Sequence, residues 1–113
     1  MSPHDKPLVW LHGVIATPPF SVEARVEAGF FLRMLQKGIS IGMPHSRPMP
    51  SIAPGCHELR INDRRYNWRI VYAVTVSAIV ILEVFEKKTE KMLKTVIDTC
   101  CSRLRNYVEL SEG

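Results

Sequence analysis

Three β-type segments follow one another in the second half of the chain, and they constrain the fold more than any other feature. The segments are Cys56–Ile61, Tyr66–Val76 and Ala78–Phe85, with turn residues at positions 62–63 and 77. The last segment is apolar on both faces, which is typical of a strand in the interior of a sheet. The chain is therefore expected to build its core on a sheet.

The first part of the chain predicts one more strand and a helix. Pro7–Leu11 is a short apolar run that ends at Gly13, so it predicts a strand, and Thr17-Pro18-Pro19 predicts an extended turn. A helix is expected between an N-cap at Ser21 and a stop at Gly38. Its buried stripe should contain Ala24, Ala28, Phe31, Leu32 and Leu35.

A second apolar line runs along the same predicted helix through Val26, Phe30 and Met34. It fits packing within the domain, and it also fits contact with another chain. Residues 39–55 hold four prolines and two glycines, which predicts an ordered loop.

The chain ends in a predicted helix that starts near Thr89 or Glu90. Its apolar stripe consists of Leu93, Val96, Ile97, Cys100, Leu104, Tyr107 and Val108. The element order, strand–helix–strand–strand–strand–helix, predicts a single α+β domain over residues 1–113. We expect a small twisted sheet with both helices packed on one face and the other face open.

Composition limits the possible functions. The net charge of +4 and the pI near 9.2 are compatible with a polyanionic partner. Cys56, Cys100 and Cys101 have neither CxxC spacing nor a zinc-type pattern, so reduced thiols in the cytoplasm are expected, with Cys100 in the core. Neither a signal peptide nor a membrane helix is predicted, and motifs for a nucleotide cofactor, a catalytic serine or a metal are missing.

Cations are the remaining candidates for chemistry. Strand alternation places Arg60 on the face opposite Leu59 and Ile61, and Arg69 interrupts an apolar strand. Three further cations are candidates: Lys87 and Lys88 follow the end of the third predicted strand, and Arg47 lies in the proline-rich loop that leads into the first of the three. Such a set can hold a phosphate and stabilise charge that develops on it. The alternative for each is a solvated surface cation. His57 could act as an acid or base, but alternation points it toward the helices, which favours a packed histidine.

Several stretches together resemble a known family. The run from Arg47 to Ile61 (RPMPSIAPGCHELRI), the strand from Trp68 to Tyr72 (WRIVY) and the stretch from Phe85 to Thr89 (FEKKT) are similar to segments of phage-derived, HigB-like toxins of the RelE/ParE superfamily. The resemblance extends from about residue 6 to residue 108. It implies a RelE-like fold and a type II toxin–antitoxin function.

The resemblance implies a metal-independent mRNA endoribonuclease without a cofactor, ribosome-associated or free, that inhibits translation. Carried over by position, Arg60, Arg69 and Lys88 match the catalytic cations around the scissile phosphate, and Arg47 and Lys87 would bind RNA. The implied partners are mRNA, the ribosome and a HigA-like helix-turn-helix antitoxin, with operator DNA reached only through that antitoxin. No membrane partner is implied. The aromatic or histidine residue found near the phosphate in many RelE-like toxins has no match in Glu90–Lys94, so the general base stays open.

Two other functions remain possible on the same fold. One is a ParE-like inhibitor of gyrase that binds without catalysis, and the other is a non-catalytic member that binds only its antitoxin. The cations Arg60, Arg69, Lys87 and Lys88 favour the ribonuclease.

Overall fold

The computed structural model describes residues 4–11, 20–64, 66–88 and 94–112. The elements, in chain order, are β1 (Leu8–Trp10), α1 (Val22–Gln36), β2 (Ser46–Pro48), β3 (Cys56–Asp63), β4 (Tyr66–Val74), β5 (Ile79–Glu86) and α2 (Lys94–Glu112). The predicted α+β class and the predicted order are confirmed. The structure adds one short strand, β2, inside the proline-rich segment. The predicted turn at 17–19, the strand stop at Gly13 and the predicted start of the last helix lie outside the described residues.

The five strands form one mixed sheet in the order β1-β5-β4-β3-β2. Strands β2 to β5 pair antiparallel with their neighbours, and β1 pairs parallel with β5. The strand predicted to be interior, β5, has a neighbour on each side. Strand β3 extends through Asn62 and Asp63, which sequence patterns assigned to a turn, because both residues pair with β4.

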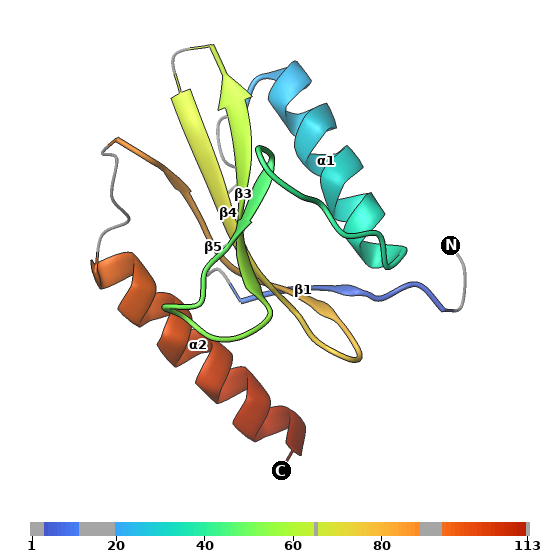
Figure 1. Cartoon of the computed structure of the whole chain (residues 1–113), viewed down its shortest axis with the longest axis vertical. Coiled ribbons are helices and arrows are strands. Elements are labelled where there is room, and N and C mark those ends of the chain that lie inside the picture. Colours follow the sequence, from blue (N-terminus) through green and yellow to red (C-terminus); the bar gives the residue numbers. More distant parts are fainter. Residues whose placement is uncertain (1–3, 12–19, 65, 89–93, 113) are drawn as a thin grey trace.

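The two helices lie on opposite faces of the sheet (Figure 1), so the prediction of both helices on one face was wrong. Helix α1 covers a cluster that includes Leu59 and Ile70, whereas α2 covers a cluster that includes Val71 and Leu82. The reason is present in β5, whose residues 79–82 are all fully buried and alternate between the two clusters. A strand that is apolar on both faces requires a cover on both faces.

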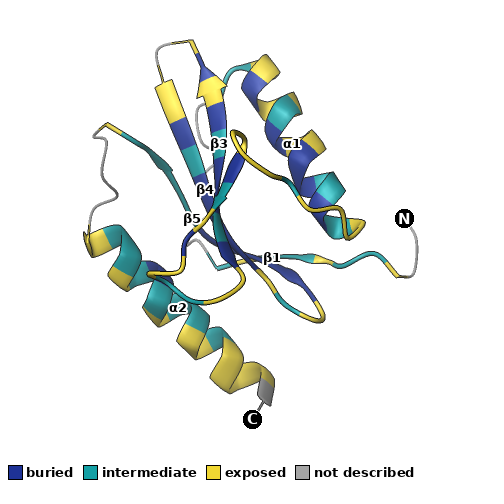
Figure 2. Ribbon diagram, viewed as in Figure 1, coloured by how far each residue is buried: buried dark blue, intermediate teal, exposed yellow. Residues whose placement is uncertain are grey.

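Helix α1 matches its predicted limits and its predicted buried stripe. Ser21 is the N-cap and its Oγ accepts a hydrogen bond from the Ala24 N–H at 3.1 Å. Gly38 ends the helix with a φ of +85°, a conformation that glycine adopts without strain. The five stripe residues are all buried: Ala24, Ala28, Phe31, Leu32 and Leu35. Figure 2 shows this buried side of α1 turned toward the sheet.

Helix α2 is held to β5 by polar contacts as well as by its apolar stripe. The Arg103 guanidinium donates to the Leu82 carbonyl oxygen at 2.6 Å and lies 3.2 Å from a Glu83 carboxylate oxygen. Cys100 is fully buried, as predicted, and burial raises the pKa of its thiol to about 12. Neither helix has a stretch, within the described residues, that is long and apolar enough to cross a membrane.

Candidate functional site

A single buried carboxylate lies at the centre of the cations that the sequence suggested. Glu58, in β3, is fully buried. Its Oε1 accepts a hydrogen bond from Arg47 Nε at 3.1 Å and lies 3.7 Å from both Arg60 Nε and Arg69 Nε. Its Oε2 lies 4.0 Å from Lys87 Nζ. We call these five residues the cation site.

Strand geometry explains why the arginines share one face. Glu58 and Arg60 are two residues apart on β3, so their side chains leave the sheet on the same side. The antiparallel register places Arg69 of β4 opposite Arg60, and Arg47 of β2 opposite Glu58. Three adjacent strands therefore contribute to one point on the face that α2 partly covers.

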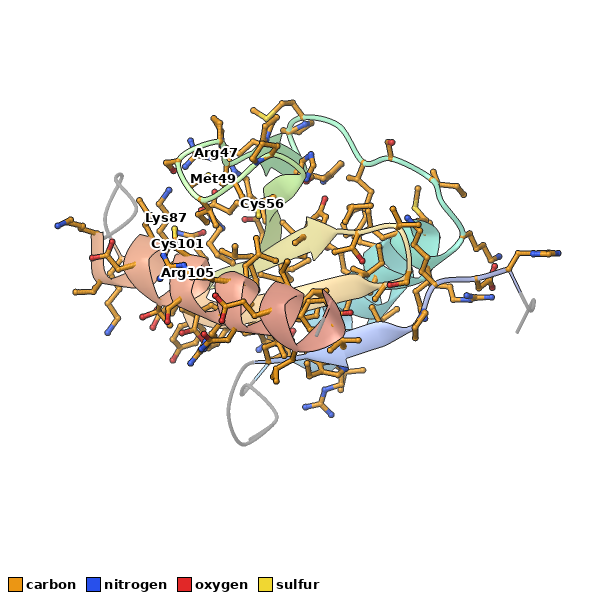
Figure 3. All side chains as sticks on the ribbon, turned by 90° about the horizontal axis from the view of Figure 1, so that it is seen from below. Arg47, Met49, Cys56, Lys87, Cys101 and Arg105 are labelled. Atoms are coloured by element: carbon orange, nitrogen blue, oxygen red, sulfur yellow. The ribbon has the colours of Figure 1, made fainter. Side chains whose placement is uncertain are left out.

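Lys87 reaches the same face because the pairing of β5 with β4 continues past the last strand residue. The Lys87 N–H donates to the Asn67 carbonyl oxygen at 2.8 Å. Phe85 pairs with Arg69 on the cation face, and alternation brings Lys87, two residues on, to the same side. Figure 3 shows the side chains of Arg47 and Lys87 on one side of the molecule, beside α2.

Lys88, which the family resemblance placed among the catalytic cations, lies elsewhere. Its side chain is 78% exposed and its Nζ lies 3.9 Å from a carboxylate oxygen of Glu86. Glu86 pairs with Trp68, whose side chain packs in the core cluster under α1, so Glu86 belongs to the opposite face. Of the two adjacent lysines, Lys87 rather than Lys88 joins the cations around Glu58.

Burial changes the acid–base properties of the two innermost cations. The side chains of Arg69 and Lys87 are only 12% and 9% exposed. Burial removes water from the Lys87 ammonium and lowers its pKa. Glu58 raises this pKa, whereas the positive charges of Arg47, Arg69 and Arg60 lower it further. The pKa of Arg69 is lowered by the same kind of burial, against the raising effect of Glu58. A lysine with a lowered pKa is better suited to proton transfer than an ordinary one.

The cation site carries a surplus of positive charge. Four cations surround one carboxylate, so three positive charges are left without a partner inside the site. Within the described structure, the buried Nε atoms of Arg60 and Arg69 make no hydrogen bond. The side chains of Arg47 and Arg60 are about one third exposed and remain open to solvent. Such a surface attracts an anion with several oxygens, for which a phosphodiester is well suited.

A groove lies between the segment that joins β2 to β3 and helix α2. It is lined by Ile52, Ala53, Cys101, Leu104, Arg105, Val108 and Glu109. Arg105 is exposed on α2, and Figure 3 shows it near Cys101. Arg105 therefore adds a positive charge to this groove, which Glu109 also lines.

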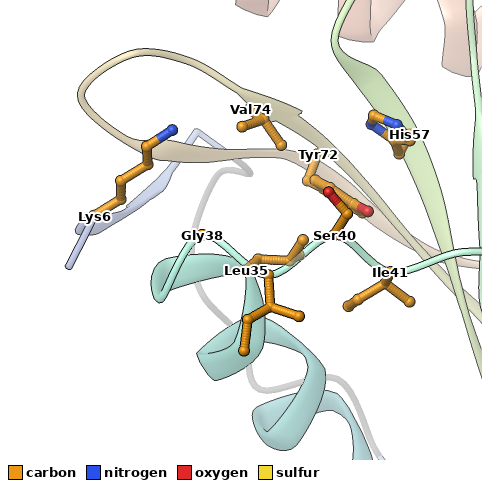
Figure 4. A pocket seen from close by; sticks show the side chains of 9 residues that line it. Lys6, Leu35, Gly38, Ser40, Ile41, His57, Tyr72 and Val74 are labelled. Atoms are coloured by element: carbon orange, nitrogen blue, oxygen red, sulfur yellow. The ribbon is translucent and has the colours of Figure 1, made fainter.

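His57 lies on the α1 face, as strand alternation predicted. Its ring stacks on Tyr72 with 5.3 Å between ring centroids, and its Nδ1 lies 3.3 Å from the Gly55 carbonyl oxygen. Both rings line a small cavity of about 120 Å³ next to Leu35 and Ile41 (Figure 4). This cavity is separated from the cation site by the sheet, so His57 does not contribute to it.

The sequence reasoning missed Glu58 at the centre of the site. A usable signal existed, because Glu58 and Arg60 are two apart in a predicted strand and so share a face. No group of three or more His, Cys, Asp or Glu side chains suited to a metal ion occurs in the part of the chain that the structure describes.

The second apolar line predicted along α1 divides between packing within the domain and exposure. Val26 and Phe30 are 67% and 61% exposed, and Val22 one turn earlier extends the line. Met34, in contrast, packs against the core under α1. The exposed line therefore consists of Val22, Val26 and Phe30, on the face of α1 that points away from the sheet.

Comparison with known proteins places the chain in a family. The family described as phage derived protein Gp49-like (DUF891) matches residues 19–105, more than three quarters of the chain and every residue of the cation site. A search of curated proteins found no match. The chain belongs to the phage-derived Gp49-like family, which is associated with toxin–antitoxin systems.

Proposed function

We propose that the protein is the toxin of a type II toxin–antitoxin pair and acts as an mRNA endoribonuclease of the RelE/HigB type. The observation that carries the proposal is the convergence of Arg47, Arg60, Arg69 and Lys87 on buried Glu58. Their surplus positive charge matches the charge that grows on a phosphodiester during cleavage. Cleavage of mRNA, free or on the ribosome, would stop translation in the cytoplasm.

RNA supplies its own nucleophile, so this reaction requires no metal-bound water. The ribose 2′-hydroxyl loses its proton and its oxygen bonds to the adjacent phosphorus, while the bond from phosphorus to the 5′-oxygen breaks. The 5′-oxygen takes up a proton and leaves as a hydroxyl, and the other product ends in a 2′,3′-cyclic phosphate. The protein has to orient these groups, move two protons and stabilise negative charge.

The positions of the cations suggest how the work is divided. Arg60 and Arg69 would bind the non-bridging oxygens of the scissile phosphate and stabilise the transition state. Lys87, with its lowered pKa, would act in the protonated form and give a proton to the 5′-oxygen. The more exposed Arg47 would bind the RNA strand, and Lys88 would contact it from the rim. Glu58 is fully buried and does not meet substrate.

The association of the family with toxin–antitoxin systems implies an antitoxin partner. We propose a HigA-like antitoxin with a helix-turn-helix domain, through which alone the pair would reach operator DNA. The exposed apolar line Val22, Val26 and Phe30 is the surface of α1 that fits such a partner.

A gyrase inhibitor of the ParE type and a non-catalytic antitoxin-binding member are the competing functions on this fold. Two buried N–H groups of the cation site make no hydrogen bond, and each such group lowers the stability of the fold. A protein that only binds another protein has no use for this arrangement. The cation site therefore favours the ribonuclease.

The test is inducible expression followed by sequencing of RNA 5′ ends, together with cleavage of RNA by purified protein with and without ribosomes. An endoribonuclease should produce new 5′-hydroxyl ends at defined positions, and Arg69→Ala should remove them. Arg25→Ala, which removes an exposed arginine of α1, is the matched control and should cut normally. DNA breaks with intact mRNA would show gyrase inhibition instead, and normal growth with neither effect would leave antitoxin binding as the function.

A further inference from the structure

Glu58 has a position that neither substrate binding nor surface charge explains. It is a fully buried carboxylate at the bottom of a cation site. Burying a charge is costly unless the surroundings compensate it, and here compensation comes from four cations on three strands and the segment after β5. A carboxylate kept at this cost is expected to act on its neighbours.

Both oxygens of Glu58 face cations of the protein. Oε1 faces three arginines, of which Arg47 is hydrogen-bonded to it, and Oε2 faces Lys87. A general base must reach the proton that it removes, directly or through one water. A side chain with no exposed surface, enclosed by cations, does not reach a ribose hydroxyl. Glu58 therefore acts through the cations.

We infer that Glu58 is a positioning residue: it is the counter-ion that holds Arg60, Arg69 and Lys87 together around one phosphate-binding point. The inference rests on the proposed function for its catalytic meaning. Arg60 and Arg69 are directly opposite each other across β3 and β4, and without an anion between them their charges repel. The shared oxygen of Glu58 lies 3.7 Å from each Nε, and its negative charge offsets the repulsion between the two arginines.

Glu58 has a second effect, on the protonation of Lys87. The charged groups that face this amine are Glu58 and Arg60 from β3, Arg69 from β4 and Arg47 from β2. All three arginines disfavour the ammonium form, and so does burial, whereas Glu58 alone in this set favours it. Glu58 thus favours the charged form of Lys87, against the effects of burial and of the three arginines.

The experiment compares the whole protein with Glu58→Gln, which keeps the shape and removes the charge, and with Glu58→Asp, which keeps the charge. Glu83→Gln is the matched control, because Glu83 is a carboxylate on strand β5 that forms an ion pair with Arg103 of α2. Three quantities are measured on each protein: thermal unfolding, the NMR titration of the Lys87 side chain, and the pH dependence of kcat and KM on an RNA oligonucleotide. The lysine NMR signal that disappears in the Lys87→Arg variant belongs to Lys87, so its titration curve can be assigned.

For Glu58→Gln we expect kcat to fall by about 10- to 100-fold with little change in KM, as for groups that orient the ligands of a catalytic centre. The pKa of Lys87 should fall, so the alkaline limb of the rate profile should move to lower pH. Glu58→Asp should restore most of both properties. Glu83→Gln should match the wild type in kcat and in the Lys87 titration, whatever its effect on unfolding.

The inference is overturned if folded Glu58→Gln keeps the wild-type kcat and the wild-type Lys87 titration. Loss of the acid limb with an unchanged alkaline limb would also overturn it, because that result marks Glu58 as a general base. If Glu58→Gln does not fold, Glu58→Asp decides: its shorter side chain moves the charge away from Lys87, so the pKa of Lys87 should fall slightly but measurably, and a wild-type titration in folded Glu58→Asp would overturn the inference. A wild-type protein that cuts no RNA, either free or on ribosomes, would refute the proposed function, while the titration would still decide whether Glu58 is the counter-ion.

Discussion

Arg60 of β3 and Arg69 of β4 are directly paired across the sheet, and both Nε atoms lie 3.7 Å from the same oxygen of Glu58. Two like charges in directly opposed positions destabilise a sheet. Proteins break such local rules mainly where function requires it. The pair therefore marks the part of the sheet where we expect mutations to affect activity more than folding.

Arg69→Ala should abolish toxicity and leave the fold intact. Arg69 is a largely buried cation at the proposed phosphate position, and removal of one charge-stabilising donor costs about 10²–10³ in rate. Growth after induction, RNA cleavage, circular dichroism and antitoxin binding are measured on the same variant. Growth arrest by a folded Arg69→Ala protein would remove this arginine from the mechanism.

Lys87→Ala and Lys88→Ala should differ, although the two residues are adjacent. Lys87 contacts Glu58 and its ammonium is nearly buried, whereas Lys88 is exposed and pairs with Glu86. We expect Lys87→Ala to lose cleavage by about 10²-fold or more with a small change in RNA affinity. Lys88→Ala should lower affinity slightly and reduce the salt dependence of binding by about one phosphate contact. Equal losses of kcat in the two variants would contradict this assignment.

Phe30→Glu, alone or with Val26→Glu, should weaken antitoxin binding while RNA cleavage stays near the wild-type rate. Both side chains are exposed on α1, and a charge placed in an apolar contact is left without a partner. Val76→Glu, in the exposed turn between β4 and β5, is the control and should bind antitoxin normally. Binding is measured by titration calorimetry. Full affinity in the Phe30→Glu protein would place the antitoxin on another surface.

Asp63 should make stability depend on pH in the acid range. Its Oδ2 accepts hydrogen bonds from the Ser21 N–H at 2.8 Å and from Trp68 Nε1 at 3.3 Å, which ties the start of α1 to the sheet. The Ser21 bonds hold the pKa of Asp63 below its ordinary value of 3.8. A lowered pKa in the folded state contributes stability above that ordinary value, and the contribution disappears as the pH falls through the folded-state pKa.

Asp63→Asn tests this contribution. At pH 7 the variant should have a lower Tm than the wild type, and the difference should narrow as the pH is lowered below 3.8. Thermal unfolding followed by circular dichroism at a series of pH values measures both curves. A constant difference in Tm across the acid range would show that the charge of Asp63 does not contribute to the stability of the fold.

The regular elements could be predicted because each has a periodicity that survives in any packing. The stripe from Ala24 to Leu35 repeats at helical spacing, and the segment from Tyr66 to Val74 alternates as a strand. The cover on both faces could have been predicted as well, since the apolar residues of β5 already point both ways. The short strand β2 has no such signal, because its three residues pair with β3 only through the tertiary fold.

The candidate site was predictable only in part. Arg60 followed from strand alternation and Arg69 from its place in an apolar strand, whereas the choice between Lys87 and Lys88 depended on the residue at which β5 stops pairing with β4. A shift of one residue moves a side chain to the other face of a sheet, and sequence patterns do not fix strand ends that closely. The register, and the Lys87 N–H bond to Asn67 that continues it, resolves the choice.

The parallel pairing of β1 with β5 has a consequence for how the molecule assembles. Strands β2 to β5 follow one another along the chain, whereas Leu8 of β1 pairs with Ile79, which is distant from it in the sequence. Closing so long a loop is slow, while adjacent antiparallel strands meet quickly. The residues from Arg47 to Lys87 can therefore find their register as one local unit before β1 docks at the edge of the sheet. In a partial opening that releases β1, the arginines and their shared carboxylate would stay assembled.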